Sequence, residues 1–378
     1  MSPLPQYDCA FVIGAIPMKY PTGGDKVTFQ LIRNLIQNGY KIALIILDNE
    51  SKRKILPMLK YKDISKILIA IVDRLPIRIQ FLLPKIFMYL RGETLFYKFL
   101  SNIDIYSSSK FQAVGLKAKN LIATWWGTAY FVNLLEGKSK NIFYLIQNQE
   151  DDVSFSGDLH SHASNSYVLK LKKIVINKSL YNRFSKDNPR LMRIGIDYEK
   201  WYYAGNKEET LLIPLRTEEY KGSKYGILAL KKIHSLIPNL KIIGFGNVRK
   251  IDVPGFIEYH YRPSSDSLKG LYRRAKYFVL PSLVEGFPLV NLEAMASRCA
   301  IVSTKFVGSE EYLRDGYNCI LVPLRDGNVI ADSILKLHND QTLVETISKN
   351  GQLTASIFTY DTMYNDFIKI LKSEGGEL

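Results

Sequence analysis

Short apolar runs alternate with amphipathic stretches through nearly the whole chain, and this alternation is the strongest constraint on its fold. The first cycle predicts a buried strand at residues 8–16, a helix at 26–37 that ends at Asn38-Gly39, and a strand at 41–47. Three further strands are predicted in the first half, at residues 120–124, 142–147 and 173–176. Strands separated by helices are typical of a parallel sheet with helices on both faces.

The alternation begins again at Thr210, after a polar segment at residues 198–209 that is a natural hinge. The second set of strands is predicted at residues 211–215, 240–244, 277–281, 300–304 and 319–322. The helices predicted between them are residues 224–235, 265–275 and 288–297. With 378 residues, each half is long enough to bury its own core. We therefore predict an α/β chain of two Rossmann-like, doubly wound domains that face a cleft, residues 1–200 and 201–357.

Positive charge is concentrated in one stretch. The chain has 51 Lys and Arg against 36 Asp and Glu, a net charge of +15, so we expect an anionic partner. Residues 51–100 carry eleven of these basic side chains and three acidic ones among many Ile, Leu, Phe and Met. They form either a helical basic insertion packed on the first domain or an amphipathic surface that docks on anionic lipid. Amphipathicity alone does not distinguish the two.

Several classes of protein are disfavoured. The N-terminal residues do not resemble a signal peptide, and no run of about 18 apolar residues predicts a membrane-spanning helix. Cys9, Cys299 and Cys319 are scattered, which excludes a disulfide framework and fits a reducing interior. We therefore expect a cytoplasmic protein, placed peripherally on the inner face of the cytoplasmic membrane if the basic segment binds lipid.

Paired glycines follow the first strand. Gly23 and Gly24 allow backbone N–H groups to approach a ligand, and the helix start behind them favours an anion. The alternative is an ordinary turn between a strand and a helix.

The segment at residues 281–295 is more informative. Glu285 lies in the loop after a buried strand, where open α/β sheets bind ligands. Pro288 suits the first position of the next helix, and Glu293 then lies inside that helix among apolar residues. Because an unpaired buried carboxylate is costly, we expect Glu293 to have a hydrogen-bonding partner. The alternative is that Glu285 caps the helix and Glu293 faces solvent.

Two basic residues follow the first strand of the second half. The guanidinium of Arg216 and the ammonium of Lys221 would together clamp a diphosphate. The alternative is that they pair locally with Glu218 and Glu219.

These motifs resemble those of the retaining GT-B glycosyltransferases of family 4. Glu285 and Glu293 match the E-x7-E motif of that family. Arg216 and Lys221-Gly222 match its Arg…Lys-Gly pair, and Gly23-Gly24 matches its first glycine-rich loop. Further similar segments are Gly195-Ile196-Asp197, Trp201, Gly308-Ser309-Glu310-Glu311 and Asp315-Gly316. The last helix, near residues 360–371, resembles the segment that crosses back, which assigns residues 358–378 to the first domain.

The resemblance implies a glycosyltransferase that takes a nucleotide-diphosphate sugar as its donor substrate. Glu293 would hold the ribose, Glu285 the donor sugar, and Arg216 and Lys221 the leaving diphosphate. The remaining donor contacts would come from the backbone around Phe287, Leu289 and Val290, and from Gly23 and Gly24. The chain has no Asp-x-Asp, and His160 and His162 are read as a polar loop, so we expect no metal and no cofactor.

The acceptor side is less defined. Relatives often have a histidine there, and this chain offers Gln147, Gln149 or Glu150 instead. Trp125 and Trp126 end the preceding strand and would stack on a sugar ring or pack in the core. The implied acceptor is a lipid-linked or cell-surface glycan. The alternatives are a non-catalytic nucleotide-sugar binder and a nucleic-acid binder, although no zinc spacing, RNP-type segment or helix-turn-helix supports nucleic acid.

Overall fold

A computed structural model of the protein describes residues 6–15, 22–48, 103–137 and 139–375. The basic segment at residues 51–100, with its predicted insertion, lies outside the described residues. The chain divides into two compact units. Unit 1 ends at Ile176 and adds Leu180–Met192 and the residues from Tyr364 onward, and unit 2 holds Asn177–Ser179 and Arg193–Met363. The main boundary therefore lies a few residues before the predicted one at 200.

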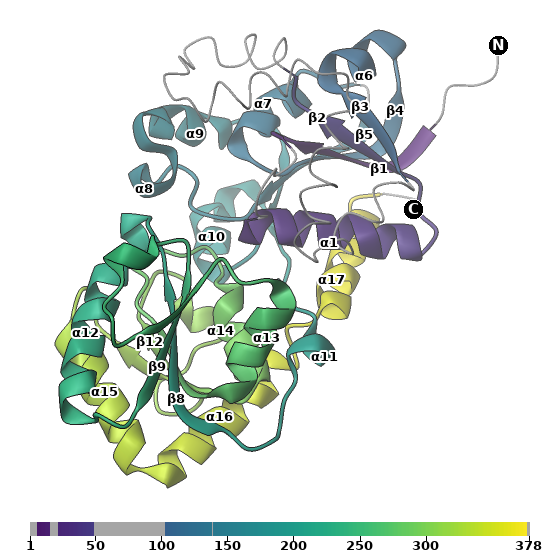
Figure 1. Ribbon diagram of the computed structural model, residues 1–378. Coiled ribbons are helices and arrows are strands. Elements are labelled where there is room, and N and C mark those ends of the chain that lie inside the picture. The colour runs from purple at the N-terminus through teal and green to yellow at the C-terminus, as the bar shows by residue number, and fades with distance from the viewer. Residues whose placement is uncertain (1–5, 16–21, 49–102, 138, 376–378) are drawn as a thin grey trace. The chain divides into compact units, whose positions relative to one another are not determined.

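Unit 1 is built on a seven-stranded parallel sheet in the order β3-β2-β1-β4-β5-β6-β7. Figure 1 labels its strands β1 to β5. Its strands are β1 (Gln6–Ile13), β2 (Ile42–Ile46), β3 (Asp104–Ser107), β4 (Lys117–Ala123), β5 (Ser139–Ile146), β6 (Lys172–Val175) and β7 (Arg190–Leu191). Its helices are α1 (Gly23–Gln37), α6 (Ser108–Val114), α7 (Trp126–Asn133), α8 (Val153–Ser156), α9 (His160–Ser166), part of α10 (Lys178–Arg183) and most of α17 (Tyr360–Ser373). The direction of winding reverses between β1 and β4, so the switch point of the sheet lies there.

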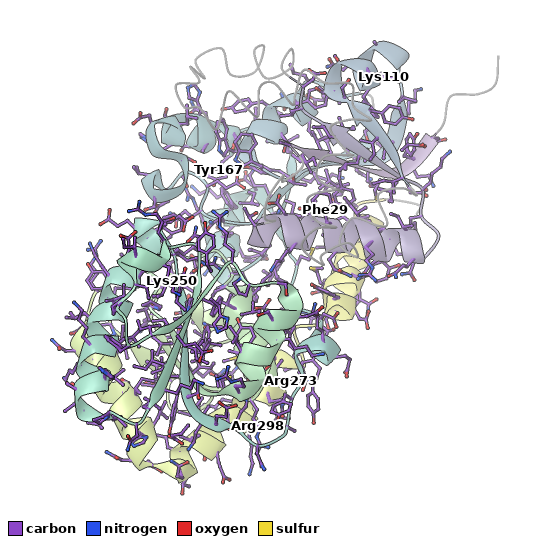
Figure 2. All side chains as sticks on the ribbon, in the orientation of Figure 1. Phe29, Lys110, Tyr167, Lys250, Arg273 and Arg298 are labelled. Carbon is purple, nitrogen blue, oxygen red and sulfur yellow. The ribbon has the colours of Figure 1, made fainter. Side chains whose placement is uncertain are left out.

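Burial explains why these strands were readable in the sequence. All five residues of β2 are buried, as expected for a parallel strand covered on both faces. Helix α1 turns its apolar face inward, and Phe29, labelled in Figure 2, belongs to that buried face. Two strands of unit 1 that we did not predict, β3 and β7, are short and only partly buried, so they have no continuous apolar run. The same holds for the strand at Glu258–Tyr261 in unit 2, which we also did not predict. His160 and His162, predicted in a loop, are in α9.

Unit 2 is a second parallel sheet, with six strands in the order β10-β9-β8-β11-β12-β13. Its strands are β8 (Glu208–Leu215), β9 (Lys241–Gly246), β10 (Glu258–Tyr261), β11 (Ala275–Leu280), β12 (Ala300–Thr304) and β13 (Ile320–Val322). Its helices are α11 (Tyr198–Trp201), α12 (Ser223–Leu236), α13 (Ser265–Arg274), α14 (Leu289–Ala296), α15 (Gly327–Asn339) and α16 (Gln341–Ala355). Helix α12 packs beside α15, and α14 packs beside α16. The switch point of this sheet lies between β8 and β11.

The segment before α11 belongs to unit 2 because it is bound there. The Ile196 N–H donates to the Phe358 carbonyl (2.9 Å), and the Tyr360 N–H donates to the Ile196 carbonyl (3.1 Å). A Cβ on Gly195 would lie 2.0 Å from the Thr359 carbonyl oxygen, so only glycine permits this approach. The Trp201 ring meets Tyr272 edge-on at 5.5 Å. Because the segment after Met192 contacts residues far along the chain, the boundary between the units lies at Met192 and not at residue 200.

Both units are therefore Rossmann-like parallel α/β domains, as predicted. Short 3₁₀ turns complete the description at Gly157–Leu159, Ser185–Asp187, Glu219–Lys221, Lys250–Asp252 and Ser309–Glu311. Among the residues that the structure describes, no helix is both long enough and apolar enough to cross a bilayer.

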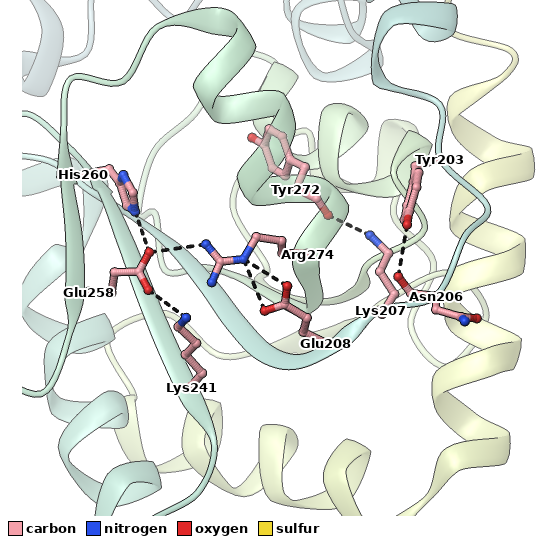
Figure 3. A network of polar contacts seen from close by, with 9 residues as sticks. All are labelled: Tyr203, Asn206, Lys207, Glu208, Lys241, Glu258, His260, Tyr272 and Arg274. Atoms are coloured by element: carbon pink, nitrogen blue, oxygen red, sulfur yellow. Dashed lines mark hydrogen bonds and ion pairs between the residues drawn. The ribbon is translucent and has the colours of Figure 1, made fainter.

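A network of ion pairs lies at the amino edge of the unit 2 sheet, where β8, β9 and β10 begin (Figure 3). Glu258 of β10 contacts Lys241 at 3.0 Å, His260 at 2.8 Å and Arg274 at 3.4 Å. Arg274 also pairs with Glu208 at 3.2 Å. The surrounding donors hold the pKa of Glu258 low, at about 2, even though burial raises it. Every charge in this network has a partner within the network.

Candidate functional site

The switch point of unit 2 brings together the charged residues that the sequence singles out. Arg216 follows β8, and the loop that holds Glu285 follows β11, the neighbouring strand. Because parallel strands end at the same edge of a sheet, both loops lie at the carboxyl edge, where open α/β sheets bind ligands. The sequence prediction for this edge is therefore matched by the topology.

Arg216 is fixed by its backbone and has a cationic side chain without an acidic partner. Its N–H donates to Ser223 Oγ (2.7 Å), and the same hydroxyl donates to the Arg216 carbonyl (2.8 Å). The guanidinium lies over the Phe245 ring, 5.9 Å from the centroid. In the described part of the chain, no carboxylate forms an ion pair with it. Arg216 is therefore a positioned cation available to an anion.

Lys221 pairs with Glu285 across the switch point. Lys221 Nζ lies 2.8 Å from Glu285 Oε2, and Ser282 Oγ donates to Glu285 Oε1 at 2.8 Å. The alternative of local pairing is wrong for Lys221, because Glu219 pairs with Lys224 instead. Two fixed donors thus hold both oxygens of the Glu285 carboxylate.

The backbone joins the same two loops. The Leu283 and Val284 N–H groups both donate to the Tyr220 carbonyl, at 2.8 and 3.3 Å. Gly222 is in the left-handed region (φ +65°), and a Cβ there would lie 2.0 Å from the Pro281 carbonyl oxygen. The Lys-Gly pair in the sequence therefore has a physical cause, since the loop of Lys221 packs directly on the loop of Glu285.

Glu293 is in the interior of α14 and only 4% exposed. Its Oε2 accepts a hydrogen bond from the Tyr272 hydroxyl at 3.0 Å, which confirms the expected partner and excludes a solvent-facing position. No sequence pattern pointed to Tyr272, because it lies on α13 and contacts Glu293 only through the fold.

The N-terminus of α14 differs from the prediction by one residue. Pro288 is the N-cap and not the first helical residue, since its ψ of 101° is extended and its carbonyl accepts from the Asn291 N–H. Leu289 and Val290 are then the first two helical residues, and N–H groups at these positions have no acceptor within a helix. The Phe287 ring packs against Tyr312 and Phe358, at 5.1 and 5.8 Å. The first turn of α14 carries no acidic residue.

The corresponding edge of unit 1 has a different helix start. Gly23 and Gly24 are the first residues of α1, and Thr22 and Asp25 cap them. The Thr22 N–H donates to Asp25 Oδ2 (2.8 Å), and the Asp25 N–H donates to Thr22 Oγ1 (3.2 Å). Burial raises the pKa of Asp25. A carboxyl group thus already lies where the prediction places phosphates.

Two of the predicted acceptor residues are buried and need correction. Trp126 is 3% and Glu150 7% exposed, and both are engaged in contacts within unit 1. Glu150 Oε2 accepts from the Trp126 N–H (2.7 Å) and from the Tyr144 hydroxyl, and burial raises the pKa of Glu150 to about 8. Gln149 is exposed and Trp125 only partly buried, so these two stay candidates.

Comparison with known proteins identifies the fold and the domain. Residues 208–340 match the family model described as glycosyl transferases group 1. The CapM capsular polysaccharide biosynthesis glycosyltransferase of Staphylococcus aureus is 30% identical over 48% of this chain and 54% of its own length. A Campylobacter jejuni alpha-1,4-N-acetyl-D-galactosaminyltransferase, whose name begins with GalNAc-GalNAc-diNAcBac-PP-undecaprenol, is 25% identical over 52% of this chain and 57% of its own.

Solved structures extend the likeness over nearly the whole chain. HepE from Anabaena, solved with UDP and glucose, covers 97% of this chain and 100% of its own, with a TM-score of 0.69 and 12% identity. Unit 2 is a group 1 glycosyl transferase domain, and the chain has the GT-B fold. The chain spans about half the length of the curated relatives that it matches.

Within this group 1 domain, several structural residues escaped the sequence analysis. Ser223, Ser282 and Tyr220 are the groups that orient Arg216, Glu285 and the Lys221 loop. Ser282 lies inside the segment already singled out, so its position three residues before Glu285 was the available signal. No group of three or more His, Cys, Asp or Glu residues is arranged to hold a metal within the described ranges.

Proposed function

We propose that this protein is a retaining, family 4-type glycosyltransferase that moves a sugar from a nucleotide-diphosphate sugar to a glycan. The observation that carries the proposal is the cluster at the switch point of unit 2. There the guanidinium of Arg216, which forms no ion pair within the described part of the chain, lies at the same sheet edge as the Lys221–Glu285 pair. This arrangement combines cations for a leaving group with a carboxylate held at two oxygens for a sugar.

The chemistry needs fixed positive charge. Transfer breaks the bond between the anomeric carbon and the diphosphate oxygen and forms a bond from that carbon to an acceptor hydroxyl oxygen, which loses its proton. Negative charge grows on the diphosphate as the bond breaks. Arg216 and Lys221 would stabilise that charge where it develops, together with the N–H groups of Leu289 and Val290 at the start of α14. In this scheme the protein's own cations neutralise the leaving group, so the reaction is proposed to need no metal.

The carboxylates would orient the donor. Glu285 would accept hydrogen bonds from hydroxyls of the donor sugar, and Lys221 and Ser282 hold its two oxygens in place for that role. Glu293, oriented by Tyr272, would hold the ribose hydroxyls. Backbone N–H groups around Phe287 would complete the donor contacts. Retention of the anomeric configuration is proposed from the match of the E-x7-E and Arg…Lys-Gly motifs.

The nature of the substrates is proposed from the similar proteins. The names of the relatives concern capsular polysaccharide and an undecaprenol-linked glycan, and a structure of similar fold was solved with UDP and glucose. We therefore propose a lipid-linked or cell-surface glycan as acceptor, a cytoplasmic site of action, and UDP-sugars as the first donors to test. We propose no nucleic-acid partner, because the charged edge of unit 2 is explained by a diphosphate.

A thermal-shift panel tests the donor. UDP-, GDP-, ADP-, CDP- and dTDP-sugars and the free diphosphates are each added at up to about 1 mM, a usual upper limit for substrate affinity. A ligand that binds only the native protein raises its melting temperature. We expect one base to stand out and Arg216→Leu to reduce its shift, while Arg249→Leu, which removes an exposed loop arginine, leaves it unchanged. No shift from any compound would contradict the proposal. Binding without transfer would favour a non-catalytic sensor.

A further inference from the structure

Trp125 occupies the switch point of the unit 1 sheet. It follows β4, and Gly14 follows β1, the strand beside it. A Cβ on Gly14 would lie 3.3 Å from the Trp125 indole, and a Cβ on Gly127 would lie 2.2 Å from it. The indole therefore packs directly against the backbone at two glycines. A side chain at position 127 would displace it.

The loop that carries Trp125 is held rigidly. The Thr124 and Trp125 N–H groups both donate to Thr128 Oγ1 at 3.0 Å, and that hydroxyl donates to the Trp125 carbonyl at 2.7 Å. The next residue, Trp126, is buried, and its ring centroid lies 4.6 Å from that of Trp125. Such a loop loses little conformational freedom when a ligand binds.

Glu150 anchors this loop from behind. Its carboxyl group accepts the Trp126 N–H, and its own N–H donates to the hydroxyl of Tyr167 (2.8 Å), which is labelled in Figure 2. Tyr167 in turn packs edge-on against Phe184 at 4.9 Å. Glu150 is thus a positioning residue for the tryptophan loop and not a ligand contact.

The exposed part of Trp125 has the properties of a carbohydrate platform. The indole is partly exposed, and its N–H has no acceptor among the described residues and is not sealed from solvent. An indole offers an apolar face and one hydrogen-bond donor, which suits the C–H face and a hydroxyl of a pyranose ring. Gln149, an exposed side chain in the loop after β5, is uncharged, so it suits hydroxyls better than a phosphate.

We propose that Trp125 stacks on the terminal pyranose ring of the acceptor, so that the acceptor is recognised by a sugar ring and not by its lipid or phosphate. The proposal rests on the proposed glycosyltransferase function and specifies its acceptor. Trp125 is then the specificity residue of unit 1, and Gly14 and Gly127 are the positions that make room for it.

Saturation-transfer NMR on the full chain tests the platform. The probes are the methyl β-glycosides of glucose, galactose and N-acetylglucosamine, with decyl phosphate as the acyclic probe. We expect at least one glycoside to bind the wild type through its C–H face. Trp125→Leu should weaken that binding roughly tenfold, as expected for loss of a well-packed aromatic contact, and Trp125→Phe should weaken it less. Tyr181→Leu, which removes another exposed aromatic ring of unit 1, should leave it unchanged.

Three outcomes would overturn the platform. They are binding of no glycoside by the wild type, equal binding by Trp125→Leu, and Trp125-dependent binding of decyl phosphate alone. If Trp125→Leu does not fold, the test uses the weaker binding of Trp125→Phe and the part of the glycoside that receives saturation from the protein. The nucleotide thermal shift separates this proposal from the proposed function, because it depends on Arg216 in unit 2. A wild type that binds a glycoside but no nucleotide diphosphate would overturn the function and leave the sugar platform.

Discussion

The two units build the same kind of sheet and put opposite chemistry at its switch point. In unit 2 the loops carry a guanidinium that has no ion-pair partner among the described residues, and an ammonium–carboxylate pair. In unit 1 the corresponding loops carry an indole, and the carboxyl group that holds its loop, Glu150, is buried and bound to an N–H and a hydroxyl. The comparison indicates that the fold determines where a site lies, whereas the loop residues determine which ligand the site binds.

The largest effect is expected at Glu285, the centre of the charged edge. Glu285→Gln keeps the shape of the side chain but removes the charge that pairs with Lys221. We expect sugar transfer to fall at least about 100-fold, as when a preorganised electrostatic group is removed from other active sites. Nucleotide binding should remain, since Lys221 and Arg216 stay cationic. The measurement is transfer of labelled sugar under saturating donor.

Glu219→Gln is the matched control for this variant. Glu219 lies two residues before Lys221, is exposed, and pairs with Lys224. Its loss should leave transfer unchanged. A Glu285→Gln protein that keeps transfer within about threefold of wild type, less than 1 kcal/mol of barrier, would remove Glu285 from the proposed mechanism.

The next effect concerns the backbone that joins the two loops of unit 2. Gly222→Ala puts a Cβ 2.0 Å from the Pro281 carbonyl at a left-handed φ of +65°. We expect a loss of roughly 1–3 kcal/mol in the free energy of unfolding, or a displaced loop and weaker nucleotide binding. Urea unfolding measures the first and the thermal shift the second. Gly255→Ala, at a glycine with open space and no positive φ, should be within about 0.5 kcal/mol of wild type. Equal stability and equal nucleotide binding of the two variants would show that the close contact between Gly222 and the Pro281 carbonyl is not needed.

The strands and the motif residues could be predicted from the sequence, whereas the partners of those residues could not. The alternating strands and helices were readable because parallel strands are buried on both faces, and β12 was predicted with its observed bounds. The motif residues Glu285, Glu293, Arg216 and Lys221 stood out by position after strands. Their partners did not, because Tyr272 and Ser282 act through contacts that only the fold creates. Trp126 and Glu150 look polar or amphipathic in sequence, and only burial shows that they serve the interior.

The pH dependence of stability should separate the two units. Burial raises the pKa of Glu150 to about 8, above its value in the unfolded chain, so the folded state binds the extra proton. This contribution is fully present below the unfolded pKa, near 4.3, and is lost as pH rises through about 8. Glu258 has the opposite sign, because its pKa is held at about 2 and its contribution is lost as pH falls through that value.

Glu150→Gln should therefore flatten the decline in unfolding free energy between pH 5 and 8, by on the order of 1–3 kcal/mol across that range. Urea unfolding at several pH values provides the measurement. Glu258→Gln should alter the acid limb, below the unfolded pKa of a glutamate. A Glu150→Gln protein that declines as steeply as wild type would assign the pH dependence to another buried group.

The smallest effect concerns the two helix starts at these edges. Helix α14 has no acidic residue in its first turn, whereas α1 holds Asp25 against Thr22. If Gly23 and Gly24 close over the phosphates of the donor, that carboxyl group opposes them whenever it is ionised. Asp25→Asn should then tighten nucleotide-diphosphate binding a few-fold, while it lowers stability by about 0.3–1 kcal/mol through loss of the charge at the helix N-terminus. Asp340→Asn removes a similar charge at the start of α16 and should change stability alone.

The measurement is titration calorimetry of nucleotide-diphosphate binding at low and high salt, because an electrostatic gain in affinity must shrink as salt rises. An Asp25→Asn affinity equal to wild type at low salt would mean that the glycine pair of unit 1 does not meet the diphosphate, and that unit 2 holds the donor phosphates without it.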